Sequence, residues 1–146
     1  MRLLLDANIL LDCLVLAASG QPRPGKSASD QLLSLCDQGG HQGMIAWHTL
    51  PIVAYYHEKQ HRAAETSAMM DTLLALLLVP SVCHNDAANW KSHGLKDFED
   101  ALQVASAMSG HAELIITRNT VDFVGCSLPV MTPEEFLANK PEKSEP

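Results

Sequence analysis

Short apolar runs along the chain alternate with longer stretches in which apolar residues recur at helical spacing. The first run, residues 2–5, ends at Asp6, and the apolar stretch 9–17 that follows predicts a buried helix. A loop rich in Gly and Pro covers 19–25, and the next helix is expected to end at Gly39. The opening therefore predicts a strand, a turn at Asp6 and two helices.

The remainder of the chain continues this alternation of strands and helices. Further strands are expected at 44–47, 77–79, 114–116 and 129–131. Further helices are expected at 49–61, where Thr49 is the predicted N-cap, and at 63–76, 85–91, 97–108 and 133–138. Because parallel neighbouring strands need crossover connections, this order predicts an α/β fold with a central parallel sheet of four to five strands flanked by helices.

Length and composition suit one domain, since 146 residues with 47% hydrophobic content can form a substantial core. We expect a single domain over 1–139 and a flexible polar tail over 140–146. Asp6 interrupts the first apolar run too early for a signal peptide, and no apolar stretch reaches spanning length. A cytoplasmic protein without membrane association is therefore expected.

The formal net charge of −7 argues against a broad basic face that grips nucleic acid through its phosphates. An acidic protein can still receive a phosphate where its carboxylates converge on a divalent ion, because the ion inverts the local field. The four cysteines are scattered and contain no C-x-x-C pair, so neither disulfides nor a zinc knuckle are indicated.

Acids and amides follow predicted strands or open predicted helices in three separate segments. They are Asp6 after the first strand, Asp97, Glu99 and Asp100 at the start of a helix, and Asn119 and Asp122 after the strand 114–116. Ligands of parallel sheets bind beyond the carboxyl ends of the strands, so these side chains could meet in one cleft. Mg²⁺ and Mn²⁺ prefer oxygen ligands and support hydrolysis of phosphodiester bonds. The pattern therefore favours a metal-dependent phosphodiesterase.

Three blocks of sequence give this pattern a more specific meaning. They are LDANILLD at 5–12, KDFEDALQVA at 96–105, and ITRNTVDF at 116–123, the last followed by MTPEEFL at 131–137. In this order and spacing the chain resembles the PIN domain family, in the group that includes VapC-type toxins, over essentially its whole length. The resemblance implies a PIN-like three-layer sandwich, ribonuclease activity that depends on Mg²⁺ or Mn²⁺, a homodimer and, in toxin members, an antitoxin protein that blocks the site.

The resemblance also implies roles for particular residues. The implied metal ligands are Asp6, Asp97, Asp100 and Asp122, and the catalytic set adds Asn119 as the alternative ligand after the strand 114–116. The implied contacts with the RNA substrate are Asn8, Lys96, Thr117 and Arg118. Asn8 lies two residues after the first acid, where the resemblance implies that it orients Asp6.

One position departs from the family. A Glu usually lies three residues after the Ser or Thr that opens the helix following the second strand, and counting from Thr49 that position is Ile52. Glu58 lies further along the same helix, about 13 Å from the cap at about 1.5 Å per residue, too far to substitute directly. Asp97 could make up the charge. The alternative function is a catalytically weak or inactive PIN-like module that binds RNA or a protein partner.

Several residues also have purely structural interpretations. Asp6 suits a helix N-cap, and helical spacing predicts that Glu99 points to solvent, away from the other acids of its helix. Asp12 lies on the first predicted helix, where it could touch the cleft rim, and a chemical role for it is the less favoured interpretation. The two tryptophans and two tyrosines of the chain are expected in the core or an interface: Trp47, Tyr55, Tyr56 and Trp90.

A competing motif is H-E-x-x-H at His57, Glu58 and His61, which on a helix can bind zinc and would indicate a metallopeptidase. The intervening residues Lys59 and Gln60 are polar, whereas such helices normally cross an apolar core. No well-placed third ligand follows. The zinc interpretation is therefore the less favoured one.

Overall fold

The strand β1 (Arg2–Leu5) lies inside a four-stranded sheet in a computed structural model that describes residues 1–139. Its neighbours are β2 (Gln42–Met44) on one side and β3 (Leu114–Ile116) on the other, and β4 (Val130–Met131) pairs with β3. All pairings are parallel, in the order β2-β1-β3-β4. The parallel α/β sheet is confirmed, with four strands, and the tail predicted at 140–146 lies outside the described residues.

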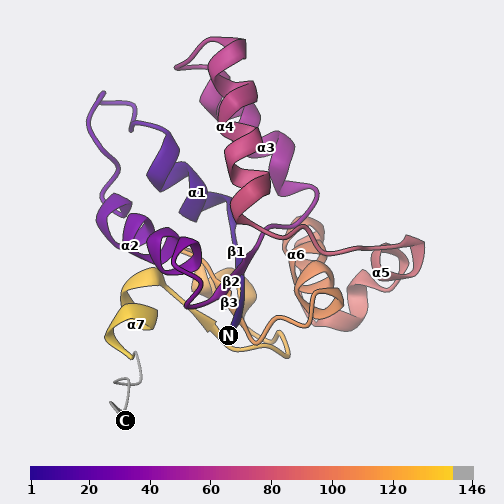
Figure 1. Cartoon of the computed structure of the whole chain (residues 1–146). Coiled ribbons are helices and arrows are strands. Elements are labelled where there is room, and N and C mark those ends of the chain that lie inside the picture. Colours follow the sequence, from indigo (N-terminus) through magenta and orange to yellow (C-terminus); the bar gives the residue numbers. More distant parts are fainter. Residues whose placement is uncertain (140–146) are drawn as a thin grey trace.

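Helices connect the strands and cover both faces of the sheet (Figure 1). The α-helices are α1 (Ala7–Leu14), α2 (Lys26–Asp37), α3 (Thr49–Glu58), α4 (Ala63–Leu76), α5 (His84–Ala88), α6 (Phe98–Ser109) and α7 (Pro133–Ala138). Two 3-10 turns are η1 (Trp90–His93) and η2 (Thr120–Phe123). None of the helices within residues 1–139 is both long and apolar enough to cross a membrane.

Alternating residues of β1 bury their side chains on opposite faces of the sheet. Leu3 and Leu5 belong to a core cluster with residues of α1, α2, α3, α4 and α7, whereas Leu4 belongs to a second cluster with residues of α6. All three leucines have 0% exposed surface. A strand buried on both faces reads as a continuous apolar run, which explains the sequence of β1.

The segment 77–79 is the main departure from the predicted elements. The prediction of a strand there is wrong, because only Leu78 pairs with the sheet, through an isolated parallel bridge to Met44. The backbone of Leu78 donates to Gly43 at 3.0 Å and accepts from Ile45 at 2.9 Å. The segment therefore covers the β2 edge at a single residue.

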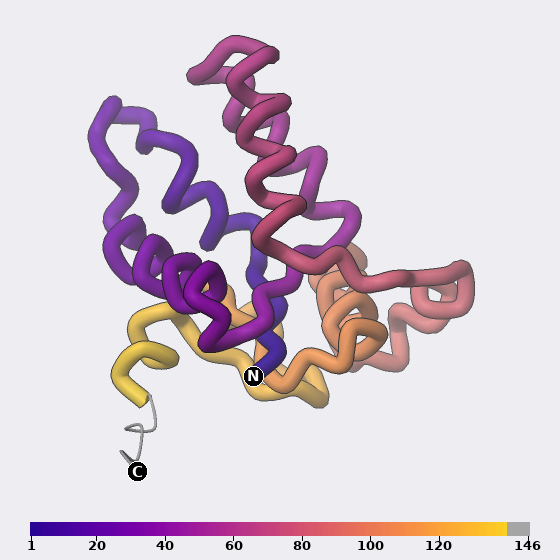
Figure 2. Tube along the Cα trace, in the orientation of Figure 1, coloured from indigo at the N-terminus to yellow at the C-terminus, as the bar shows by residue number. Residues whose placement is uncertain are grey.

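The start of α3 also differs, since His48 is the N-cap and Thr49 is the first helical residue. Figure 2 shows the pair formed by α3 and α4 extending away from the sheet, on the side where β1 runs into α1. The carboxyl end of β1, the start of α3 and the start of α6 therefore lie on one side of the molecule, which is where the candidate site is found.

Candidate metal centre

Asp6 follows β1 and is the N-cap of α1. Its backbone is extended (φ −71°, ψ 157°), and its Oδ1 accepts a hydrogen bond of 2.6 Å from the Ala7 amide. Burial raises the pKa of Asp6 above its ordinary value, and hydrogen bonds to the carboxylate act in the opposite direction. The N-cap interpretation is confirmed, and it leaves the second carboxylate oxygen for other partners.

Thr117 and Asn8 bind that second oxygen. Thr117 Oγ1 donates to Asp6 Oδ2 at 2.7 Å, and Asn8 Nδ2 donates to the same atom at 2.9 Å. The Asn8 side-chain oxygen accepts from the Arg118 backbone N–H at 3.2 Å, which ties the start of α1 to the segment after β3. Asn8 and Thr117 therefore orient Asp6, and their contact with a substrate stays a prediction.

Three carboxylates gather at the start of α6. Asp97 is the N-cap, and its Oδ1 accepts from the Asp100 amide at 3.1 Å. One oxygen from each of Asp97, Glu99 and Asp100 lies within 4.8 Å of the others. The prediction that Glu99 points away from the other two acids is wrong, because the extended backbone of Asp97 (φ −83°, ψ 131°) breaks the helical spacing on which it rested.

Asp100 shows that the acids of the separate segments converge. Its pKa is raised from 3.8 to about 7, first by burial and then by the negative charges of Glu99, Asp97, Asp6 and Asp122. Gln103 Nε2 lies within 3.2 Å of both Asp6 Oδ1 and Glu99 Oε1, and one oxygen of Glu99 lies within 4.8 Å of one oxygen of Asp100. Asp6 and Asp100 therefore face the same site, although 94 positions of sequence separate them. Convergence at the carboxyl edge of a parallel sheet explains this arrangement.

Asp122 and Asn119 lie at the outer side of this site. Asn119 precedes η2 and Asp122 is within it, and both are exposed. The Asn119 amide donates to Thr117 Oγ1 at 3.1 Å, so the turn is attached to the residue that orients Asp6. Of these two residues, Asp122 carries the negative charge and helps to raise the pKa of Asp100.

The predicted substrate contacts Arg118 and Lys96 differ in their surroundings. The guanidinium of Arg118 makes five hydrogen bonds, to Asp12, Glu134, the Gly25 carbonyl and Ser29. A contact between this guanidinium and a substrate would compete with those bonds. Lys96 is exposed beside Asp97 and makes no hydrogen bond or ion pair within the part of the chain that the structure describes.

Gln103 is a buried polar residue of the site that the sequence did not single out. It has 0% exposed surface, and its Nε2 lies 3.1 Å from Asp6 Oδ1, 3.1 Å from Thr49 Oγ1 and 3.2 Å from Glu99 Oε1. Its Oε1 is buried without a hydrogen-bond partner. Its position one turn after Glu99 on α6 was the only signal in the sequence that could have found it.

The residues of the site fit a divalent cation. All donors are oxygens, which Mg²⁺ and Mn²⁺ prefer. Within residues 1–139, no ion pair with Lys or Arg involves Asp6, Asp97, Asp100 or Asp122. The orphaned Gln103 Oε1 is an acceptor that the water shell of an ion could satisfy. Asp6, Asp97, Glu99, Asp100 and Asp122 could therefore hold such an ion.

The H-E-x-x-H motif does not form a comparable site. His57 is buried and its Nδ1 lies 2.7 Å from Thr66 Oγ1, while its ring stacks on His61 with centroids 4.0 Å apart. The acidic cluster is the one group of three or more potential metal-binding side chains among residues 1–139, and no third ligand accompanies the two histidines. The geometry gives the zinc interpretation no support.

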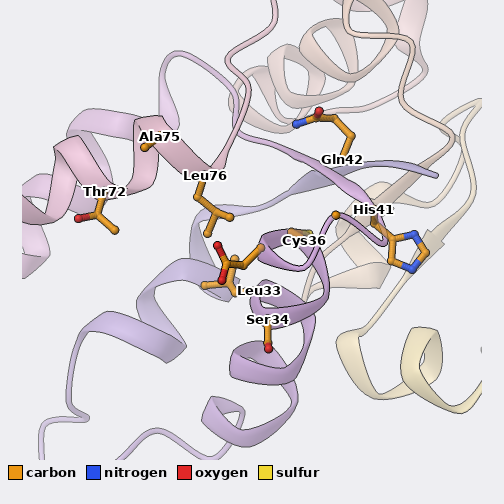
Figure 3. Close-up of a pocket in the computed structure, with 10 residues that line it drawn as sticks. Leu33, Ser34, Cys36, His41, Gln42, Thr72, Ala75 and Leu76 are labelled. Atoms are coloured by element: carbon orange, nitrogen blue, oxygen red, sulfur yellow. The ribbon is translucent and has the colours of Figure 1, made fainter.

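Large hollows and exposed aromatic residues lie outside the acidic cluster. A hollow of about 800 Å³ lies between α2, β2 and α4, and no predicted site residue lines it (Figure 3). Trp47 has 69% of its surface exposed, Tyr55 57% and Tyr56 44%, so of the two predicted locations, core or interface, the core is excluded for these three residues. Their role in an interface stays a prediction.

A parallel sheet with carboxylates converging at its carboxyl edge defines an α/β protein built around a candidate metal centre. The sequence profile of the PIN domain matches residues 2–121. The chain therefore belongs to the PIN domain family, as its motifs indicated. Proteins of this family are generally nucleases, and they typically use divalent metals.

Solved structures share this fold. A toxin-antitoxin complex from Klebsiella pneumoniae has a chain that is 25% identical, with a TM-score of 0.64 over 89% of this chain and 96% of that chain. A chain of VapBC2 from Rickettsia felis, solved bound to a DNA fragment from the promoter, is 15% identical, with a TM-score of 0.63 over 90% of this chain and 98% of that chain. A chain of FitAcB from Neisseria gonorrhoeae is 15% identical, with a TM-score of 0.60 over 90% of this chain and 98% of that chain. No curated protein matches the sequence.

Proposed function

We propose that the protein is a metal-dependent endoribonuclease that hydrolyses RNA phosphodiester bonds with Mg²⁺ or Mn²⁺. The observation that carries the proposal is the group of carboxylates at the start of α6, where one oxygen each of Asp97, Glu99 and Asp100 lies within 4.8 Å of the others and Gln103 Nε2 joins Glu99 to Asp6. The negative charges of Asp6, Asp97, Glu99 and Asp122 all raise the pKa of Asp100. Four like charges around one half-buried carboxyl group disfavour its ionisation, and a divalent cation among them would offset this cost. Asp6, Asp97, Asp100 and Asp122 are the proposed ligands.

When bound, the ion supplies positive charge to the phosphate and makes a water molecule more acidic. The chain's own residues hold the carboxylates in place: Thr117 and Asn8 fix Asp6, and the helix start fixes Asp97. The exposed Lys96 is the proposed contact to an RNA phosphate. Asn119 stays the proposed alternative ligand after β3.

We further propose that the nuclease is the toxin of a toxin-antitoxin pair. The Klebsiella pneumoniae structure is described as a toxin-antitoxin complex and is the most similar in sequence of the three structures described above. A partly apolar hollow of about 160 Å³ lies beside the centre, between Trp47, His48 and residues of α5 and α6. This hollow and the exposed Trp47 ring suit a small antitoxin protein as partner. A homodimer is also proposed.

The proposed activity is tested by incubating the purified protein with labelled single-stranded and hairpin RNA in Mn²⁺, Mg²⁺ or EDTA. Cleavage is expected with Mn²⁺ or Mg²⁺ and not with EDTA. Asp6→Asn, which keeps the N-cap, should reduce the rate by about 100-fold or more. Asp71→Asn changes an exposed acid of α4 and is the matched control that should leave the rate unchanged.

Ile52 motivates the second candidate function, a PIN-like module that binds RNA or a protein without cleaving. Its apolar side chain contributes no ligand and leaves the start of α3 without a carboxylate of its own. RNA binding that is retained in EDTA, together with no cleavage by the wild-type protein in any divalent ion, would favour this function over the nuclease.

A further inference from the structure

Glu99 has surroundings that a solvated helix residue would not have. Its Oε1 lies 3.0 Å from His48 Nε2, at the N-cap of α3, and 3.2 Å from Gln103 Nε2 on its own helix. His48 and Gln103 therefore hold the carboxylate of Glu99 at one position.

Gln103 connects this carboxylate to Asp6. One Nε2 atom lies within 3.2 Å of both Asp6 Oδ1 and Glu99 Oε1, so the acid after β1 and the acid of α6 meet at a single buried amide. The other atom of that amide, Oε1, is buried and lacks a donor. An unpaired buried carbonyl oxygen destabilises the folded protein, and the water shell of a cation held by these acids could supply the donor.

Glu99 also lies next to the end of α3 that carries Ile52. Gln103 Nε2 is 3.1 Å from Thr49 Oγ1, in the first turn of α3, and His48 immediately precedes that turn. The start of α3 therefore contributes a hydrogen-bonding imidazole to the centre in place of a carboxylate. Glu99 is therefore a carboxylate on α6 that lies against the start of α3, the helix in which Ile52 supplies none.

We propose that Glu99 is a ligand of the divalent cation and that His48 and Gln103 are the positioning residues that hold its carboxylate toward the centre. This inference rests on the proposed function, since it adds a ligand to the same site. His48 lies outside the sequence blocks that resemble the PIN family, so the resemblance gave this residue no role. The cation would then be held by Asp6, Asp97, Glu99 and Asp100, with Asp122 at the outer side.

The inference is tested by titrating Mn²⁺ into the intact protein by calorimetry and by recording the Mn²⁺ paramagnetic resonance spectrum. Glu99→Gln removes the charge at nearly constant volume and should weaken Mn²⁺ binding by about tenfold or more. Glu58→Gln makes the same change at an exposed acid of α3 and should leave the affinity within twofold of wild type. Glu99→Asp retains a carboxylate and should bind more tightly than Glu99→Gln.

The role of His48 is tested separately. His48→Ala should weaken Mn²⁺ binding, His48→Gln should restore most of it because an amide N–H can replace the imidazole donor, and His48→Ala should add little in a Glu99→Gln background. Equal Mn²⁺ affinity in wild type, Glu99→Gln and His48→Ala would overturn the inference and leave the proposed nuclease standing. A wild-type protein that binds no Mn²⁺ would overturn both.

Discussion

Arg118 Nε donates a hydrogen bond of 2.7 Å to Asp12 Oδ2, across 106 positions of sequence. The same guanidinium binds Glu134 on α7 and the Gly25 carbonyl before α2, so it joins the segment after β3 to three helices or their flanks. Asp12 is only 5% exposed, which makes its charge costly without a partner. This pair holds the end of β3 in place beside the metal centre.

Replacing Arg118 by Lys should destabilise the protein by about 2 to 4 kcal/mol, because an ammonium cannot reproduce the planar fork that contacts Asp12 and Glu134 together. Urea unfolding monitored by tryptophan fluorescence measures the change. Arg23→Lys is the matched control, since Arg23 reaches Asp12 through a single bond of 3.1 Å. A loss in Arg118→Lys no larger than that in Arg23→Lys would contradict this account.

Gly25 is required by the close approach of this network. A Cβ built at Gly25 would lie 2.1 Å from Asp12 Oδ2 and 2.3 Å from Arg118 Nη2. Gly25→Ala should therefore cost about 1 to 3 kcal/mol in unfolding free energy. Ser27→Ala, at an exposed position in the first turn of α2, should change stability by less than about 0.5 kcal/mol. Equal stability of the two variants would show that the network can shift without cost.

Asp100→Asn should stabilise the protein in EDTA by about 1 kcal/mol, or roughly 2–4 °C in melting temperature. The substitution removes a half-buried charge that Glu99, Asp97, Asp6 and Asp122 all disfavour. The same variant should lose the rise in melting temperature that Mn²⁺ gives the wild-type protein. Thermal scans with EDTA and with Mn²⁺ measure both effects, and a lower melting temperature of Asp100→Asn in EDTA would refute the predicted repulsion.

Stability should fall in mild acid in part because of His57. Burial and the charge of His61 lower the pKa of His57 below 6.5, although Glu65 and Glu58 act in the opposite direction. The folded state therefore binds this proton more weakly than the unfolded state, and stability is lost as the pH falls from above 6.5 toward the folded-state value.

Unfolding free energies between pH 7.5 and pH 5.5 test this sign. The wild-type protein should lose more stability than His57→Gln, because the other titrating groups are shared and their contributions cancel. His84→Gln, at an exposed position of α5, should follow the wild-type curve. Parallel curves for wild type and His57→Gln would rule out the contribution.

The sequence predicted those parts of the fold that depend on local signals. The helices at 63–76 and 133–138 have the predicted bounds, the latter because Thr132 and Glu135 form a capping box with Pro133 as the first helical residue. Asp6 and Asp100 meet because strand ends and helix starts share one edge of a parallel sheet, which the order of elements already implied.

The remaining features depend on contacts that no local pattern encodes. Glu99 turns inward because His48 and Gln103 offer it hydrogen bonds, and His48 lies 51 positions away. Arg118 resembled a substrate contact because a basic residue follows the motif strand, but its partner Asp12 lies on α1. In both cases the sequence identified a charged residue, and the folded structure was needed to identify the residues that it contacts.

Gln103 touches three segments that are far apart in the order of synthesis: the end of β1, the start of α3 and the first turn of α6. A chain that has not yet added α6 has Asp6 but lacks Asp97, Glu99 and Asp100. During synthesis of the proposed nuclease, the metal centre therefore cannot assemble until α6 has been added to the growing chain.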